Sequence, residues 1–232
     1  MTSPLRTEAR CQQRAGRRFD AVIFDLDGTL ADTLEDIGAA MNEALRRLGQ
    51  PTHPPDAYRE FVGEGVNKLA QAALPPDQHD LVARAVSEFR AHYAAHLVDR
   101  TRPFPEIPTA LDALVERGIK LAVLSNKLDA MTRRIVELCF GRWPFHPVFG
   151  EREGVPKKPD PSGALEIASA LGVAPPRMAM VGDTAIDIRT ARAAGMHAVG
   201  VTWGFRPREE VAEAGADAVV GTPRELLEIL LR

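Results

Sequence analysis

Short runs of apolar residues, many of them β-branched, alternate with helical patterns along most of the chain. The runs are FDAVIFD (19–25), IKLAVLSN (119–126), HPVFG (146–150), MAMVGD (178–183), HAVGVTWG (197–204) and DAVVG (217–221). Each run has the length of a buried strand and ends in polar residues or glycine. This alternation is typical of βαβ units, so it predicts an α/β fold with a Rossmann-like parallel sheet and helices on both faces.

One stretch interrupts the alternation. From about Glu35 to Arg100 only helical patterns occur, such as IGAAMNEALRRLG and LVARAVSEFRAHYAAHL, broken by QPTHPP and LPPDQ. We therefore expect a small helical cap domain at 34–100, inserted into a core made of 19–33 and 101–232. The arginine-rich residues 1–18 are expected to be a disordered tail, although a transit peptide has a similar composition.

Several residues are placed where helices should begin or end. Asp129 can cap the helix AMTRRIVELC, and Gly118 and Gly195 stand where left-handed helix stops are expected. Thr222 and Glu225 have the spacing of a capping box for the last helix. These signals support the predicted succession of strands and helices.

Composition narrows the class of protein. The chain has 232 residues, is 45% hydrophobic and carries a formal net charge of -3, which gives no reason to expect a nucleic acid or an anionic membrane as partner. No apolar run approaches the length of a membrane span. Its two cysteines, Cys11 and Cys139, provide neither a disulfide framework nor a zinc site. A reducing, cytoplasmic setting is expected.

Polar residues follow three of the predicted strands. They are Asp25 and Asp27; Ser125 and Asn126; and Asp183, Thr184 and Asp187. Because ligands bind beyond the carboxyl ends of parallel strands, these side chains should meet at one edge of the sheet. Carboxylates at such short distances repel one another, and a bound hard cation or a raised pKa relieves the repulsion. A site with only oxygen ligands favours Mg²⁺. A simpler role, as a helix cap, is expected for Asp32.

The motifs DLDGTLADT, LSNK, KKPDP and VGDTAIDI occur in this order at the predicted strand ends. They resemble the four motifs of the haloacid dehalogenase superfamily of phosphohydrolases, and the resemblance covers the chain from about Phe19 to its end. In that superfamily the second aspartate separates phosphatases from dehalogenases. Asp27 occupies that position here, so the resemblance implies a phosphatase.

The resemblance also implies roles for the residues. Asp25 would attack phosphorus to form an aspartyl-phosphate, and Asp27 would protonate the leaving group and then activate water. Mg²⁺ would be held by the Asp25 carboxylate, the Asp27 backbone carbonyl and Asp183, with Asp187 in a supporting role. Thr184 stands where the family usually has serine.

The phosphoryl group would be bound by a second set of residues. The Ser125 hydroxyl and backbone N–H groups around Asn126 would donate to it. The family places its lysine directly before proline, which selects Lys158 and leaves Lys157 as a solvated neighbour.

The stretch FVGEGVNKL is the part of the inserted domain that does not read as plain helix packing. Gly63, Glu64 and Gly65 resemble the VGxG cap loop of phosphoglycolate phosphatases, as SNKLDAMTRRIVE and GVTWGF also do, whereas RPFPEIPTAL departs from that subgroup. The resemblance implies hydrolysis of 2-phosphoglycolate, with Glu64 near the leaving group. A sugar phosphate, nucleotide or pyrophosphate remains an alternative substrate. A sugar phosphomutase is disfavoured because the loop has no arginine.

Two further pairs of residues have open roles. His92 and His96 have helical spacing, but without a third ligand they are expected on a solvated face or in cap packing rather than at a metal. Trp203 and Phe205 follow the fifth strand and either wall the pocket or pack in the core. The expected partner is a small phosphate ester, and the expected assembly is a monomer or homodimer.

Overall fold

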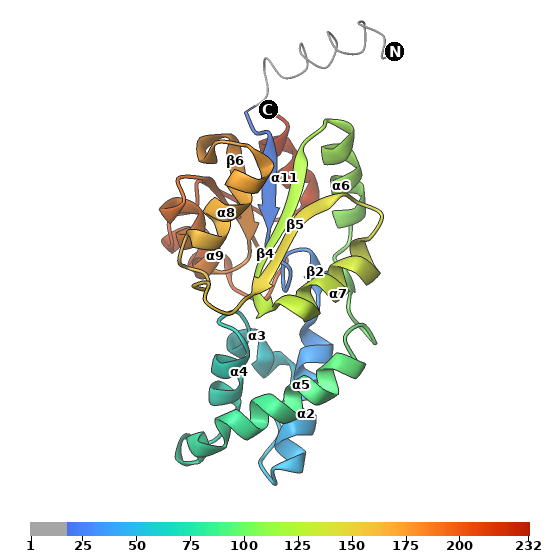
Figure 1. The fold of residues 1–232 in the computed structure, drawn as a ribbon, viewed down its shortest axis with the longest axis vertical. Helices are drawn as coiled ribbons and strands as arrows, with labels where there is room; N and C mark the ends of the chain where they lie inside the picture. The colour runs from blue at the N-terminus through green and yellow to red at the C-terminus, as the bar shows by residue number, and fades with distance from the viewer. Residues whose placement is uncertain (1–17) are drawn as a thin grey trace, which may run out of the picture.

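The computed structural model describes residues 18–232, so residues 1–17, with most of the expected tail and Cys11, lie outside the described part. Six parallel strands form one sheet in the order β5-β4-β1-β6-β7-β8 (Figure 1). They are β1 (Ala21–Phe24), β4 (Lys120–Leu128), β5 (Phe145–Glu151), β6 (Met178–Gly182), β7 (His197–Val201) and β8 (Ala218–Val220). All six predicted runs are strands, and the predicted fold class is confirmed.

Helices cover both faces of the sheet because its central strand is apolar on both sides. In β1, Val22 and Phe24 pack in one hydrophobic cluster, and Ala21 and Ile23 pack in another. The first cluster includes residues of α6 (Ile107–Glu116), α7 (Asp129–Phe140) and α11 (Pro223–Leu230). The second includes residues of α8 (Ser162–Leu171), α9 (Ala185–Ala193) and α10 (Arg208–Glu213).

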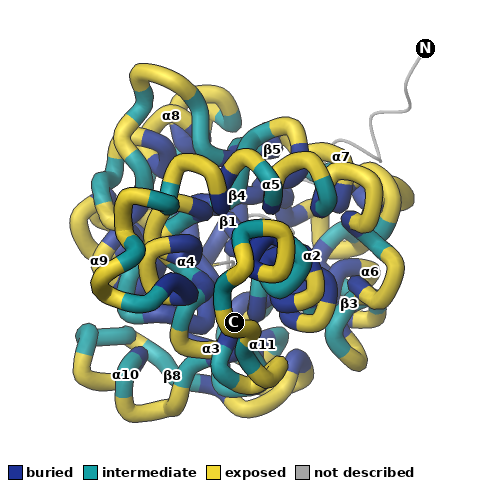
Figure 2. The backbone as a smooth tube through the Cα atoms, turned by 90° about the horizontal axis from the view of Figure 1, so that it is seen from below, coloured by how far each residue is buried: buried dark blue, intermediate teal, exposed yellow. Residues whose placement is uncertain are grey.

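The interrupting stretch forms a separate bundle of helices beyond the carboxyl ends of the strands, drawn below the sheet in Figure 1. Its helices are α2 (Leu34–Arg47), α3 (Tyr58–Phe61), α4 (Val66–Ala73) and α5 (Val82–Ala95), with short 3₁₀ turns at Pro55–Ala57 and Pro76–Leu81. Seen from this end, α2, α4 and α5 expose their outer faces and bury their inner ones (Figure 2). No helix within residues 18–232 is long and apolar enough to cross a membrane.

The two segments that join the bundle to the core pair with each other. Strands β2 (Ala31–Asp32) and β3 (Arg102–Pro103) are antiparallel, with Ala31 opposite Pro103. Next to them, the buried Asp36 carboxylate accepts hydrogen bonds from the backbone N–H of Thr101 at 2.8 Å and from its hydroxyl at 2.8 Å. The sequence did not predict this pair, because strands of two residues carry no periodicity.

Most of the predicted helix signals are found in the structure. Gly118 and Gly195 have φ of 68° and 69° and follow α6 and α9, as predicted. The Thr222 hydroxyl accepts from the Glu225 N–H at 3.2 Å, but the Glu225 carboxylate accepts from Gly221 rather than from Thr222. The first hydrogen bond of the predicted capping box is therefore formed, whereas the second comes from the N–H of the residue before Thr222.

The predicted cap at Asp129 is wrong. Asp129 is the first residue of α7, and its Oδ1 accepts from the Gly150 N–H of β5 at 2.9 Å. Its other oxygen accepts from Arg133 at 2.6 Å. The Asp129 carboxylate therefore makes a tertiary contact to the neighbouring strand in place of the expected cap on its own helix. The prediction for Asp32 is closer, since its Oδ1 receives the Leu34 N–H at 3.4 Å at the start of α2.

Candidate active site

Three aspartates meet where β1 and β6 end. Asp25, Asp183 and Asp187 each offer a carboxylate oxygen, and these oxygens lie within 4.8 Å of one another. Their exposures are 7%, 0% and 1%. We call these three residues the acidic cluster. The sheet brings them together because β1 and β6 are neighbours, with the Asp25 N–H donating to the Val181 carbonyl at 2.9 Å.

One buried ammonium lies against the acidic cluster. Lys158 Nζ is 2.9 Å from Asp25 Oδ1 and 2.6 Å from Asp187 Oδ1. Asp183 instead accepts from the Thr29 hydroxyl at 3.1 Å and from the Phe205 N–H at 2.8 Å. Three carboxylates with one ammonium leave an excess of buried negative charge, which suits a hard divalent cation.

The pKa values reflect this crowding. Burial raises the pKa of Asp25 to about 7, although Lys158 opposes the shift, and Asp187 adds to it. Burial also raises the pKa of Asp183 to about 8, with contributions from Asp187 and Asp25. Burial lowers the pKa of Lys158, but the charges of Asp187 and Asp25 outweigh it and the net pKa is raised. Protons would therefore compete with any cation for the same carboxylates.

Two glycines make room for Asp183. Gly28 has φ of 81°, a conformation that favours glycine, and a Cβ there would overlap the Asp183 carboxylate. A Cβ on Gly204 would overlap the Asp183 side chain and the Gly28 carbonyl oxygen. The close approach of these loops explains glycine directly after Asp27, in the motif DLDGT.

The side chains of Asn126 and Thr184 hold their neighbours in place. Asn126 Oδ1 accepts from the Lys158 N–H at 2.9 Å, and its Nδ2 donates to the Lys158 carbonyl at 3.1 Å. Thr184 and Asp187 form a capping box at the start of α9, with the Thr184 hydroxyl donating to Asp187 Oδ2 at 2.7 Å. The first arrangement fixes Lys158, which contacts the acidic cluster, and the second fixes Asp187, which belongs to it.

Asp27 lies apart from the acidic cluster and has its own partners. Lys127 Nζ donates to both of its carboxylate oxygens, at 2.8 and 2.9 Å, and the Thr33 hydroxyl donates to Oδ1 at 2.7 Å. Burial lowers the pKa of Lys127, but the nearby Asp27 charge outweighs it and the net pKa is raised. The Asp27 side chain is thus held in a fixed position beside the cluster.

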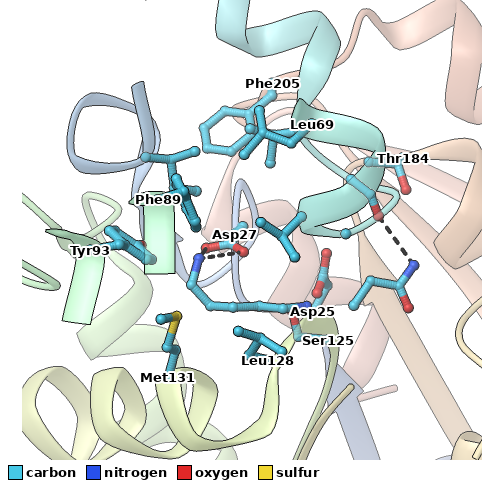
Figure 3. Close-up of a pocket in the computed structure, with 17 residues that line it drawn as sticks. Asp25, Asp27, Leu69, Phe89, Tyr93, Ser125, Leu128, Met131, Thr184 and Phe205 are labelled. Atoms are coloured by element: carbon cyan, nitrogen blue, oxygen red, sulfur yellow. Dashed lines mark hydrogen bonds and ion pairs between the residues drawn. The ribbon is translucent and has the colours of Figure 1, made fainter. Parts of the chain in front are cut away.

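A cavity of about 50 Å³ separates these core residues from the helical bundle. Asp25, Asp27 and Ser125 line it from the core, as Figure 3 shows. From the bundle, the lining residues are mainly apolar: Ile37, Val62, Gly63, Gly65, Val66, Leu69, Phe89 and Tyr93. Asn126 joins the two sides, since its Nδ2 donates to the Gly63 carbonyl at 3.2 Å. The cavity has room for a few water molecules, and so for a small ligand.

A sequence model of the haloacid dehalogenase-like hydrolases matches residues 19–195. The chain belongs to this family. The predicted superfamily is therefore confirmed, and the match spans the residues of the acidic cluster as well as the helical bundle.

Known relatives of this hydrolase narrow the family further. The phosphoglycolate phosphatase of Aquifex aeolicus is 36% identical over 184 residues, which are 79% of this chain and 85% of the relative. That of Nitrosospira multiformis is 33% identical over 219 residues, which are 90% of this chain and 95% of the relative. A crystal structure from Lactobacillus delbrueckii subsp. bulgaricus, provisionally assigned as a phosphoglycolate phosphatase, has a TM-score of 0.85 and 32% identity, covering 92% of this chain and 99% of that one.

Not every predicted site residue of this hydrolase faces the cavity. Glu64 is exposed and is absent from the cavity lining, whereas Gly63 and Gly65 on either side line it. The Glu64 carbonyl accepts from Lys157 Nζ at 3.4 Å, so Lys157 contacts the bundle. The glycine spacing thus brings the backbone of this loop, rather than the Glu64 side chain, to the cavity.

The aromatic pair has two different placements. Phe205 lines the cavity of this hydrolase, and Trp203 instead donates from Nε1 to the Thr29 carbonyl at 3.1 Å. His92 and His96 stack with ring centroids 4.4 Å apart, and His96 pairs with Asp99 at 2.7 Å. Within residues 18–232, the acidic cluster is the one grouping of three or more possible metal ligands, so the histidine pair is not one.

Sequence reasoning missed Lys127. The residue lies in the motif SNK, but a lysine after a strand more often points to solvent. Its burial depends on Asp27, which is a hundred residues earlier, and on the bundle. Its position two residues after Ser125 was the available signal, because alternate residues of an extended strand point to the same side.

Proposed function

We propose that this hydrolase is a metal-dependent phosphatase that hydrolyses 2-phosphoglycolate. The observation that carries the proposal is the convergence of Asp25 and Asp27 at one small cavity, with the Lys158 ammonium paired to Asp25 behind it. A phosphate ester is anionic and resists attack by a carboxylate, so its hydrolysis requires charge compensation, a positioned nucleophile and a proton for the leaving oxygen. Each of these requirements has a candidate residue in the site.

The proposed reaction has two steps on phosphorus. An Asp25 carboxylate oxygen forms a bond to phosphorus as the bond to the ester oxygen breaks, and Asp27 gives its proton to that oxygen. A water molecule then attacks phosphorus and gives a proton to Asp27. The acyl-phosphate bond breaks, which releases inorganic phosphate and regenerates Asp25.

The proposed ligands of the divalent ion are the Asp25 and Asp183 carboxylates and the Asp27 carbonyl, with Asp187 in support. The fit rests on the acidic cluster itself, which offers only oxygen donors and an excess of negative charge over Lys158. We propose Mg²⁺ as the ion, because it is a hard cation with a preference for carboxylates. When bound, it would offset the charge between Asp25 and the phosphate.

The remaining residues are proposed to bind the phosphoryl group and to cover it. Ser125 and backbone N–H groups near Asn126 would donate to phosphate oxygens, with Lys158 compensating their charge. Residues 34–100 would act as a cap on the core formed by 19–33 and 101–232, with Gly63 and Gly65 at its contact with the cavity. Thr184 would fix Asp187 through the capping box.

The choice of 2-phosphoglycolate rests on the cavity and on the relatives. A cavity of about 50 Å³ suits a short leaving group better than a sugar or a nucleoside. The curated relatives from Aquifex aeolicus and Nitrosospira multiformis carry this substrate in their names. Another small phosphate ester is the alternative. A phosphomutase is less well supported, because the loop VGEG supplies no arginine for a second phosphate.

A cytoplasmic location and a monomeric or homodimeric state complete the proposal. In the described part of the chain, Cys139 is a free thiol, as a reducing compartment allows. The net charge of -3 gives no general attraction to nucleic acids or anionic membranes. The small phosphate ester is then the expected partner.

The experiment is a screen of phosphate esters, read as released phosphate. Protein stripped of metal by a chelator should be inactive and should recover in excess Mg²⁺. Phosphoglycolate should have the highest kcat/KM, ahead of a sugar phosphate, a nucleotide and pyrophosphate. Full activity in excess chelator would contradict the role of the metal. A preference for a bulky ester would contradict the substrate.

A further inference from the structure

Lys127 is the one cationic side chain that lines the cavity among the described residues. The other charged groups in the lining are Asp25 and Asp27. Lys158 lies behind Asp25 and is held by the acidic cluster. A ligand that carries a negative charge on the bundle side of the cavity therefore has Lys127 as its available counter-ion.

The hydroxyl of Tyr93 lies beside this ammonium. Lys127 Nζ is 4.9 Å from the centroid of the Tyr93 ring, and Tyr93 lines the cavity from α5, as seen in Figure 3. The hydroxyl is buried and makes no hydrogen bond of standard geometry in the described part of the chain, and the Lys127 ammonium is close enough to oppose the rise of the Tyr93 pKa that burial causes. A buried hydroxyl without a well-formed hydrogen bond is unfavourable, so an anionic ligand that reaches the ammonium would also gain a bond from the Tyr93 hydroxyl.

The rest of the wall on this side cannot recognise a charge. Leu69, Phe89, Leu128 and Met131 line the cavity around Lys127 and Tyr93. An anionic group placed there would lose its hydration and gain no hydrogen bond from these side chains. Lys127 and Tyr93 are thus the polar pair among these apolar side chains, and the other uncharged polar residues of the lining are Ser125, Asn126 and Thr184.

We propose that Lys127 Nζ and the Tyr93 hydroxyl bind the carboxylate of the leaving group and so select acidic phosphate esters. This inference rests on the proposed function, because it assigns the part of the site that recognises glycolate. It makes Lys127 a specificity residue contributed by the core, where sequence reasoning had assigned specificity to the Gly63–Gly65 loop of the bundle.

The distances are compatible with this assignment. In the proposed reaction Asp27 donates to the ester oxygen, over a hydrogen bond of about 2.7 Å. Lys127 Nζ is 2.8 and 2.9 Å from the two Asp27 oxygens, so it lies within about two hydrogen-bond lengths of that ester oxygen. The carboxylate of glycolate begins one methylene beyond it. An ammonium has three N–H donors, and Asp27 accepts from two.

Lys127 could instead serve only to orient Asp27, and the two roles predict different selectivity. A residue that acts only through Asp27 affects every substrate that needs a proton on its leaving group. A residue that binds the carboxylate affects acidic esters more than neutral ones. The informative quantity is therefore the ratio of kcat/KM for phosphoglycolate to kcat/KM for 2-hydroxyethyl phosphate, which is similar in size and uncharged on its leaving group.

The test measures this ratio in Lys127→Gln and Tyr93→Phe. We expect it to fall by about 10- to 100-fold in Lys127→Gln and by about tenfold in Tyr93→Phe, through a raised KM for phosphoglycolate, as for lost hydrogen bonds to a charged group. Lys127→Arg keeps the positive charge, so its ratio should fall less than that of Lys127→Gln. Lys157→Gln removes a neighbouring lysine outside the cavity lining and should leave the ratio unchanged.

Equal losses on both esters in Lys127→Gln would overturn the proposal and leave Lys127 as a positioning residue for Asp27. Tyr93→Phe removes a single oxygen from the interior. An unchanged ratio in this variant would show that the Tyr93 hydroxyl does not bind the carboxylate. If wild-type protein hydrolyses neither ester, the proposed function fails, and calorimetry with glycolate still decides the inference. Binding of glycolate to the wild-type protein that is lost in Lys127→Gln supports the inference. Absence of glycolate binding to the wild-type protein overturns it.

Discussion

The acidic cluster should bind its metal in competition with protons, and this competition can be measured as stability. Burial moves the pKa of Asp25 from 3.8 to about 7 in the metal-free fold. Between about pH 5 and pH 7 the metal-free folded state therefore holds about one more proton at Asp25 than the unfolded state does. Because the folded state binds the extra proton, the free energy of unfolding falls as the pH rises through this window.

The size of the effect follows from the shift. One extra proton changes the free energy of unfolding by about 1.4 kcal/mol per pH unit, so two units remove about 3 kcal/mol. Asp183, whose pKa is raised to about 8, acts in the same direction. For a chain of this length, about 3 kcal/mol corresponds to a change in Tm on the order of 10 °C. Bound metal keeps the carboxylates ionised in the fold, so the loss should be absent.

The assay is thermal unfolding at several pH values, with excess chelator in one sample and excess Mg²⁺ in the other. The increase in Tm caused by Mg²⁺ should grow by about 10 °C from pH 5 to pH 7. The difference in Tm between the two samples cancels the contribution of titrating groups remote from the metal. One such group is His197, whose pKa is lowered mainly by burial. A stabilisation by Mg²⁺ that is constant or decreases with pH would refute the reasoning.

Three further predictions concern single residues. Asp25→Asn keeps the shape of the nucleophile without its charge, so phosphate release should fall by about 10⁴-fold or more, and a rate within tenfold of wild type would exclude the covalent route. Gly28→Ala should lower both Tm and Mg²⁺ affinity because its Cβ overlaps Asp183, whereas Gly154→Ala, with φ of 75° and open space around it, should lower Tm only. Glu64→Ala should change kcat/KM for phosphoglycolate by less than about twofold, because the side chain is exposed, and a selective loss would restore the role expected from the sequence.

The sheet could be read from the sequence because its signals are local. Each strand is a short apolar run, and the polar residues that follow it must emerge at one edge once the strands are parallel. Asp25, Asp183 and Asp187 could therefore be grouped without knowing any distance. The left-handed turns at Gly118 and Gly195 were equally local, since they depend on backbone conformation alone.

The parts that could not be read depend on contacts between distant segments. Lys127 is buried only because Asp27 and Tyr93 surround it, and no feature of the residues next to it in the chain shows this. Asp129 has the residue type and position of a helix cap, but the N–H of Gly150 competes for its carboxylate. Glu64 has a charge that suggests chemistry, yet only the backbone around it reaches the cavity. In each case the tertiary neighbour decides the role.

The pairing of β2 with β3 affects how the chain can fold. Strand β1 pairs with β4, so Phe24 must meet Val123 across a long intervening segment. Once the helical bundle has formed and Ala31 has paired with Pro103, most of that segment is bypassed, and the loop that remains is several-fold shorter. The lower entropy of closure favours β1–β4 pairing by about 1 kcal/mol. Pulse-labelled hydrogen exchange should then show α2 and α5 protected before β1, so that an inserted domain speeds the assembly of the sheet it interrupts.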